Sequence, residues 1–324
     1  MAHLPERVFG FLARNTVLIV LFALITVFTV LTPARFWSAE NIQNLASQTA
    51  FNAIPAFGVV LVLIVGGIDL SVGSVVAMAA ALAVGLQDYG VPVAVSVAML
   101  MGVGVGVLNG LLVTRLRIPA FIATLGTMTI VFGLLLTYTG QEPISGQIDW
   151  FTGLGSGNIG PVPVPTLIMV VILVVFQIML KYTRFGHNLY AIGSNAAAAF
   201  QVGIKVDRHR MGAYVLSASC AALAGVMLAA RLNSASIHTG QQTALLVITG
   251  CIMGGASILG GRGSAVGALL GILALGILGN GMNLLSVFTY QQLAVRAILF
   301  ISVVAVDSFY TTTVRRRLVR TGAK

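Results

Sequence analysis

A lone carboxylate, Asp69, interrupts the most apolar part of the chain. Residues 66–74 read Gly-Gly-Ile-Asp-Leu-Ser-Val-Gly-Ser, and Asp69 is the only charged residue between Glu40 and Asp88. If the flanking apolar segments lie in a membrane, this carboxylate should face a bundle interior, a polar cavity or the membrane boundary. Glycine permits non-helical backbone and close approach of other groups. The stretch therefore predicts a polar break between two buried helices, and we expect Asp69 to fix it by accepting hydrogen bonds from amides or hydroxyls.

A second glycine-rich interruption occupies residues 254–264, which read Gly-Gly-Ala-Ser-Ile-Leu-Gly-Gly-Arg-Gly-Ser. A phosphate-binding loop has to be considered, but the pattern Gly-x4-Gly-Lys-Ser/Thr occurs nowhere in the sequence. The stretch is more typical of a tight break at the cytoplasmic edge of a membrane, with Arg262 at the interface. The glycine pairs near positions 66 and 254 also suggest two similar halves.

No set of side chains for catalysis or metal binding emerges from the sequence. His187 and His209 lie in a polar segment, while Cys220 and Cys251 lie in apolar segments without metal-ligand spacing. A nucleophile with a base and an orienting group cannot be assembled. We therefore expect no metal and no cofactor on this chain, and an intramembrane enzyme is the disfavoured alternative from another functional class.

One cation, Arg296, falls within the last apolar segment, where it needs a partner or a route to the interface. Asp307 follows eleven residues later, which is about 16 Å along a helix, so the two are not expected to pair directly. A tertiary partnership between Arg296 and Asp69 stays open.

The composition indicates a polytopic membrane protein. Of 324 residues, 58% are hydrophobic and only 8% are charged, and the mean hydropathy is +1.00, whereas ordinary chains carry about 25% charged residues. We predict one all-α transmembrane domain over residues 1–324, with about ten spans, some short or broken, near the usual length of ~20 residues. The predicted spans are Thr16–Leu31, Ala46–Val65, Val72–Leu86, Val91–Val113, Ile118–Tyr138, Val162–Leu180, Met211–Ala230, Thr243–Leu259, Ser264–Leu285 and Gln291–Phe309.

The net charge of +10 is distributed as the positive-inside rule requires and not as a nucleic-acid surface. With a cytoplasmic start and ten crossings, the inside segments hold fifteen of the eighteen Lys and Arg residues. Both termini are therefore predicted to be cytoplasmic. The long loop 140–161 has no Lys or Arg and should face outward, while the basic loop 182–210 should lie in the cytoplasm.

The basic loop contains a predicted short helix. Asn195 is a good N-cap, the four alanines that follow are strong helix formers, and Gly203 can close the helix in a left-handed conformation. A helix this short is marginal in water and needs a docking surface. By local physics alone it could equally be an ordinary helical connector.

Several of these stretches resemble the signatures of ribose-type permeases of ABC importers, within the branched-chain amino acid/ribose permease family. The Gly-Gly-Ile-Asp-Leu-Ser-Val-Gly stretch is the most specific of them. The 254–264 stretch, the Pro119 helix start and the Asn280–Asn283 region follow in the expected order. The chain departs from the family at Ala196, where many relatives carry Glu. It departs again at residues 241–246, where an acidic pair is commonly found.

The resemblance implies a role for two sets of residues. The loop 182–210 would be a cytoplasmic coupling segment that docks on an ATPase subunit, through Gly193, Asn195, Ala197, Ala198, Gly203 and Ile204. The translocation hinges or pathway would comprise Gly66, Gly67, Asp69, Ser71, Gly73, Gly254, Gly255, Ser257, Gly260, Gly261, Asn280 and Asn283. The asparagines could equally cap or cross-link helices.

The implied function is that of a permease subunit in an ATP-driven importer of a sugar or sugar-like solute, in the bacterial inner membrane. The implied partners are ABC ATPase subunits that carry the ATP, an extracytoplasmic solute-binding protein and a second permease subunit, identical or different. No nucleic-acid partner is expected. An ion-coupled secondary transporter is the alternative within transport, although its coupling would rest on Asp69 and Arg296 alone.

Overall fold

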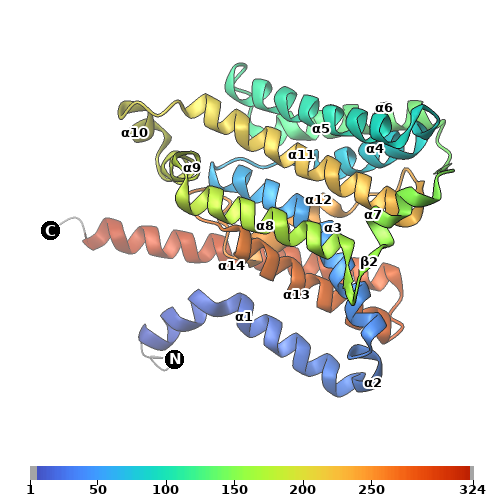
Figure 1. Cartoon of the computed structure of the whole chain (residues 1–324). Helices are drawn as coiled ribbons and strands as arrows, with labels where there is room; N and C mark the ends of the chain where they lie inside the picture. Colours follow the sequence, from blue (N-terminus) through green and yellow to red (C-terminus); the bar gives the residue numbers. More distant parts are fainter. Residues whose placement is uncertain (1–5, 322–324) are drawn as a thin grey trace.

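The computed structural model describes residues 6–321 and, apart from position 149, the side chains of residues 17–305. Figure 1 shows a bundle of helices that run roughly side by side. The helices are α1 (Glu6–Leu31), α2 (Pro33–Phe36), α3 (Ala39–Ile64), α4 (Val72–Gly85), η1 (Gln87–Tyr89), α5 (Val91–Thr114), α6 (Ala120–Thr139), η2 (Asp149–Thr152), α7 (Gly153–Ser156), α8 (Val164–Tyr182), α9 (Arg184–Ser194), α10 (Ala196–Gln201), α11 (Val206–Leu232), α12 (Thr243–Met253), α13 (Ala265–Leu284) and α14 (Thr289–Thr321).

Six helices are long and apolar enough to cross a membrane: α3, α5, α6, α8, α11 and α13. Four shorter apolar helical stretches accompany them within the described residues: Val17–Leu31, Val72–Gly85, Thr243–Met253 and Thr289–Ala305. Each of the ten predicted apolar segments coincides with one of these ten stretches. The multi-pass helical architecture is confirmed, whereas ten complete crossings stay a prediction.

Five predicted segment ends lie five or more residues from the ends of the corresponding helices. Three of these helices extend further than predicted: α1 begins at Glu6 and not Thr16, α3 begins at Ala39 and not Ala46, and α14 ends at Thr321 and not Phe309. The other two differences are at α12 and α11. The segment expected to run to Leu259 ends at Met253, because a left-handed glycine, Gly255, stops the helix there. The segment expected to begin at Met211 begins at Val206, so α11 takes in five residues assigned to the basic loop.

Four strands of two residues each are the regular structure that accompanies the helices in the described part of the chain. β1 (Ile144–Ser145) pairs antiparallel with β4 (Ser234–Ala235), and β2 (Asn158–Ile159) pairs antiparallel with β3 (Val162–Pro163). These pairs organise the long loop before α8, which had been predicted only as a loop. The all-α prediction is correct for the bundle but missed these strands.

Helix α11 lies in the middle of the bundle and packs against α3, α4 and α5. Small residues allow this close packing: a Cβ atom added to Gly106 of α5 would lie 2.6 Å from the Cα of Val215, and one added to Gly58 of α3 would lie 2.6 Å from the Cα of Ser217. Such small-residue interfaces are typical of membrane helices, which gain no hydrophobic driving force from lipid.

Helix α1 begins, and α14 ends, on the same side of the bundle as α9 and α10, at the left of Figure 1. α7 and the strand pairs lie on the opposite side. This arrangement agrees with a common side for the two chain ends and the basic loop, as the distribution of charge predicts.

Candidate coupling junction

The first break begins with a glycine cap on α3. Gly66 has φ 77°, and its amide donates to the carbonyl of Leu63 at 2.9 Å. The amide of Gly67 donates to the carbonyl of Val62, also at 2.9 Å. Together these two bonds form a Schellman motif, which needs a left-handed residue at the position of Gly66. The backbone then runs without regular structure until α4 starts at Val72.

Asp69 is buried and accepts three hydrogen bonds. Its Oδ1 accepts from the Ser71 amide at 3.0 Å and from the Ser71 hydroxyl at 2.6 Å. Its Oδ2 accepts from the hydroxyl of Ser217 on α11 at 2.8 Å. The amide nitrogen of Asn109 on α5 donates to the Ser71 hydroxyl at 2.9 Å. The expected hydrogen bonds from amides and hydroxyls are confirmed, and they tie the break to α5 and α11.

Sequence reasoning had missed Ser217 and Asn109. Both are fully buried polar side chains within apolar stretches of their helices, and the available signal was that a buried polar group requires a partner. Arg296 does not complete this site: its Nη1 donates to Oε1 of Gln242 at 3.4 Å. The side chain of Asp307 lies outside those that the structure describes.

The second break begins in the same way as the first. Gly255 has φ 96°, and its amide donates to the carbonyl of Ile252 at 2.9 Å. The next amide, of Ala256, donates to the carbonyl of Cys251 at 2.9 Å. A Cβ on Gly254 would collide with the backbone of Gly267 on α13, so α12 and α13 approach each other at backbone distance.

The predicted short helix of the basic loop is confirmed as α10. The side chain of Asn195 caps it by accepting from the Ala198 amide at 3.0 Å. Gly203, at φ 86°, ends it with a third Schellman motif, in which the Ile204 amide donates to the carbonyl of Ala199 at 3.1 Å. Ala197 and Ala198 are exposed, as are the large side chains of Phe200 (72%) and Val202 (77%). α10 therefore carries an unpaired apolar face.

The two breaks and the basic loop meet at one point. The amide of Gly261 in the second break donates to the carbonyl of Ile64 at the end of α3, at 2.8 Å. Gly193 in α9 lies against both of these groups so closely that any Cβ would collide with them. The Tyr190 hydroxyl of α9 donates to the carbonyl of Gly263 at 2.8 Å.

We call this contact the glycine junction and define it by its backbone groups and one phenol: Ile64, Gly66, Tyr190, Gly193, Gly260, Gly261 and Gly263. Gly260 completes it, since a Cβ there would lie 3.0 Å from the Gly193 carbonyl oxygen and 3.0 Å from the Gly66 amide. The junction brings together predicted residues from all three stretches. The sequence could not show that they meet.

Other predicted residues lie outside the junction. Gly73 packs against the backbone of Gly240. Asn280 exchanges two hydrogen bonds with Asn41 of α3, at 2.7 and 3.1 Å. Asn283 accepts from Gln292 at 2.7 Å. These amides cross-link helices, which is the alternative left open for them, and the structure does not join them to the rest of the predicted site.

A cavity of about 230 Å³ lies on the other side of the first break, between α4, α6 and the loop before α12. Its polar groups come from Ser74, Thr129, Thr239 and Gln241, and Phe132 contributes an aromatic wall. The lining contains no charged residue. No group of three or more His, Cys, Asp or Glu side chains that could hold a metal ion occurs among the described residues.

The family model described as "Branched-chain amino acid transport system / permease component" matches residues 41–304. The chain belongs to this permease family. It is therefore a multi-pass transport protein, and the resemblance drawn from its motifs is confirmed.

Three named permeases show how similar in sequence the chain is to known proteins. The ribose import permease protein RbsC of Bacillus subtilis is 43% identical over 291 residues, which cover 89% of this chain and 90% of the relative. RbsC of Escherichia coli K12 is 38% identical over 305 residues, covering 92% and 95%. The L-arabinose transport system permease protein AraH of E. coli K12 is 33% identical, covering 90% of each chain. No solved structure matches the chain.

Proposed function

We propose that this chain is the permease subunit of an ATP-driven ABC importer that moves a sugar or sugar-like solute into a bacterial cell by alternating access. The relatives named for ribose and arabinose transport support the class of solute. The observation that carries the mechanism is the glycine junction, where the basic loop touches the ends of both broken helices through backbone groups.

The loop 182–210 acts as the coupling segment in this proposal. Exposed Phe200 of α10 and Val202, the residue that follows the helix, offer an apolar surface to an ATPase subunit. A displacement of α9 would act directly on Ile64 and Gly261, because Gly193 leaves no free space between them. Movement driven by ATP on the partner subunit thus reaches the end of α3 and the second break, between α12 and α13, through direct contact.

The proposed topology has ten crossings in one domain, residues 1–324, with both termini in the cytoplasm. The six long and four shorter apolar helical stretches supply the crossings, and the positive-inside distribution gives the orientation. The proposed location is the bacterial inner membrane. The proposed partners are ATPase subunits, an extracytoplasmic binding protein and a second permease subunit.

The uncharged cavity beside α4 favours a neutral solute. Hydroxyl and amide groups of Thr129, Thr239 and Gln241 can exchange hydrogen bonds with sugar hydroxyls, and Phe132 offers an apolar face. An ion-coupled carrier would need an ionisable group free to bind the ion. Asp69 is buried, and its oxygens are committed to Ser71 and Ser217, which favours a structural role.

A pull-down of the tagged chain from mild detergent, with ATPase activity assayed in the eluate, tests the proposed function. We expect an ATP-hydrolysing subunit to co-purify, and Gly193→Glu to release it while the chain stays in the membrane fraction. Gly153→Glu, in α7 on the opposite side of the bundle and with no neighbouring atom near its Cβ position, is the matched control and should retain the subunit. A chain that elutes alone and shows ion-dependent uptake in liposomes would contradict the proposal.

A further inference from the structure

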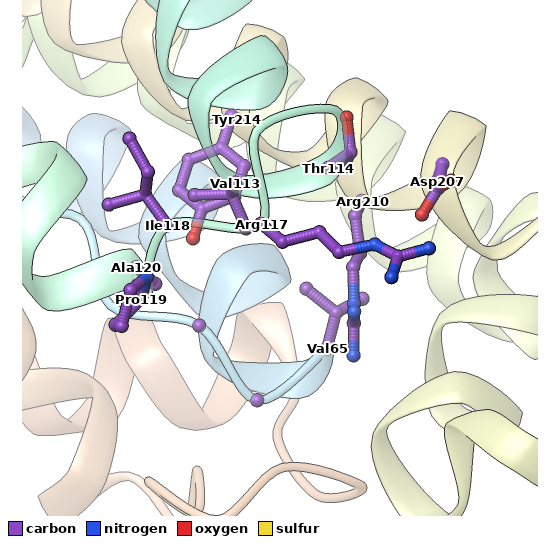
Figure 2. Close-up of a pocket in the computed structure, with 12 residues that line it drawn as sticks. Val65, Val113, Thr114, Arg117, Ile118, Pro119, Ala120, Asp207, Arg210 and Tyr214 are labelled. Atoms are coloured by element: carbon purple, nitrogen blue, oxygen red, sulfur yellow. The ribbon is translucent and has the colours of Figure 1, made fainter.

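A second cavity, of about 380 Å³, lies next to the first break and shares Gly66 with the glycine junction, but none of its charged residues has a role in the coupling proposed above. Its walls come from three segments: the end of α3 with Gly66 and Gly67, the connection between α5 and α6, and the start of α11. Figure 2 shows the side chains of Arg117 and Arg210 extending from two of these segments into the same space.

The charges of the lining do not cancel. Arg117 and Arg210 contribute two positive charges and Asp207 contributes one negative charge, and the other lining residues are uncharged. Asp207 and Arg210 stand in the first turns of α11, while Arg117 stands in the α5–α6 connection with φ 54°. Two guanidinium groups from separate elements thus face one cavity, and the lining holds a single carboxylate.

Uncharged hydrogen-bond donors in the lining favour an anionic ligand, as does the net positive charge. Helix α6 starts at this cavity with Pro119 as its N-cap and without a side-chain cap on its first amides, so the positive end of the helix is open there. The Tyr214 side chain is 1% exposed and lines the cavity, and its hydroxyl has no hydrogen-bond partner among the described residues. A buried hydroxyl without a partner calls for an explanation such as a ligand.

We propose that this cavity binds an anionic phosphate group between Arg117 and Arg210. Guanidinium groups match phosphate oxygens with paired N–H donors, and the α6 terminus and the Tyr214 hydroxyl are neutral donors elsewhere in the lining of the same cavity. Asp207 opposes the anion and tunes its affinity. A bound phosphate would bridge the α5–α6 connection and the start of α11 directly beside Gly66 and Gly67, a regulatory contact that the importer function does not require.

Two sources can present this group: the headgroup of an anionic lipid or a free phosphate compound. Leu116, Phe121 and Ile122 beside the cavity are 66%, 53% and 59% exposed, which gives acyl chains an apolar surface. The cavity also has room for a small phosphate monoester. The chemistry at the arginines is the same for both sources.

The test uses the complex purified with its partner subunits and reconstituted in nanodiscs. In nanodiscs of phosphatidylcholine alone, binding of inorganic phosphate and of glucose 6-phosphate is measured by calorimetry. In parallel, the melting temperature is measured as phosphatidylglycerol replaces phosphatidylcholine. Saturable binding in neutral nanodiscs assigns a free phosphate, and a melting temperature that rises with phosphatidylglycerol assigns a headgroup.

Variants of the lining residues test whether phosphate binding or the rise in melting temperature depends on this cavity. Arg117→Gln combined with Arg210→Gln should weaken whichever response the wild type shows by about tenfold or more, and Asp207→Asn should strengthen it. Arg115→Gln, two residues away but outside the lining, is the matched control and should behave as wild type. The proposal is overturned if neither arm responds in the wild type, or if the double arginine variant responds as strongly as the Arg115 control.

Discussion

In both breaks an apolar helix ends at a left-handed glycine, Gly66 in the first and Gly255 in the second, and the same pair of amides bonds back to the helix. Three residues further on the two breaks diverge. The first has Asp69, buried and bonded to Ser71 and Ser217, whereas the second has Ile258 at the corresponding place.

The divergence shows two ways of stabilising irregular backbone between apolar helices. A carboxylate network ties the first break to α5 and α11, so its geometry depends on side chains. The second break is held mostly by backbone contacts, including the Gly261–Ile64 bond and the close approach of Gly193. Both breaks contact α9 through Gly193, but only the first is also anchored by a buried side-chain network.

Replacing Asp69 should distinguish the breaks most strongly. Asp69→Ala leaves the buried donors of Ser71 and Ser217 without their acceptor, and we expect it to cost about 4 kcal/mol of stability. Ile258→Ala, at the corresponding and only partly buried position, should cost about 1 kcal/mol. Thermal denaturation of both variants in detergent measures the difference, and equal losses would show that the carboxylate is not the anchor.

The conservative change Asp69→Asn tests the role of Asp69 separately from its packing. The amide keeps one acceptor oxygen for Ser71, so we expect intact assembly and only modestly reduced transport. Uptake assays with the assembled complex provide the readout. Complete loss of transport in an assembled complex would instead assign Asp69 a coupling role.

Adding one methyl group at the junction should have the next largest effect. Gly193→Ala forces a Cβ against the Ile64 carbonyl and the Gly261 amide, and overpacking of this kind costs about 2 kcal/mol. Gly104→Ala on α5, where no atom lies within 4 Å of the added Cβ, is the control and should keep its melting temperature. A Gly193→Ala variant as stable as this control would show that the junction is loosely packed.

The two helix caps form a matched pair. Gly66→Ala and Gly255→Ala each place a Cβ on a left-handed residue, with nearest neighbours no closer than 3.7 Å for the first and none within 4 Å for the second. Each should therefore cost about 1 kcal/mol through backbone conformation alone. Clearly different melting temperatures of the two variants would show that the two caps do not contribute equally to stability.

The smallest effect is expected at the phenol of the junction. Tyr190→Phe removes one hydrogen bond to the Gly263 carbonyl and should cost about 1 kcal/mol or less. Burial raises the pKa of Tyr190 above its ordinary value of 10.0, so the folded protein favours the protonated phenol. Its contribution is complete below pH 10 and is lost as pH rises through the folded-state pKa. Wild type and variant should therefore converge in stability only in strongly alkaline buffer.

The sequence predicted local features well because local chemistry decides them. The Asn195 cap, the alanine helix and the Gly203 stop follow from residue types at adjacent positions, and the structure has all three. Asp69 was identified from the sequence because a single charged group in an apolar segment requires hydrogen-bond partners. The span that was predicted to reach Leu259 failed because hydropathy continues past Gly255 while helical backbone does not.

Long-range contacts were beyond local reasoning. Ile64, Gly193 and Gly261 are far apart in the sequence, and they meet through backbone groups. Every residue has the same backbone groups, so residue types do not reveal which of them will meet. Ser217 and Asn109 were predictable only as buried polar residues that needed partners. Asn280 looked like a pathway residue, but its amide pair with Asn41 depends on how α3 and α13 pack.

The most direct test of the junction is the amount of solute taken up per ATP hydrolysed in proteoliposomes that contain the assembled complex. We predict that Gly193→Ala retains ATP hydrolysis but lowers this ratio severalfold, because α9 no longer fits against Ile64 and Gly261, while Gly104→Ala keeps the wild-type ratio. An unchanged ratio for Gly193→Ala would contradict the proposal that motion passes from the basic loop to the broken helices through this contact.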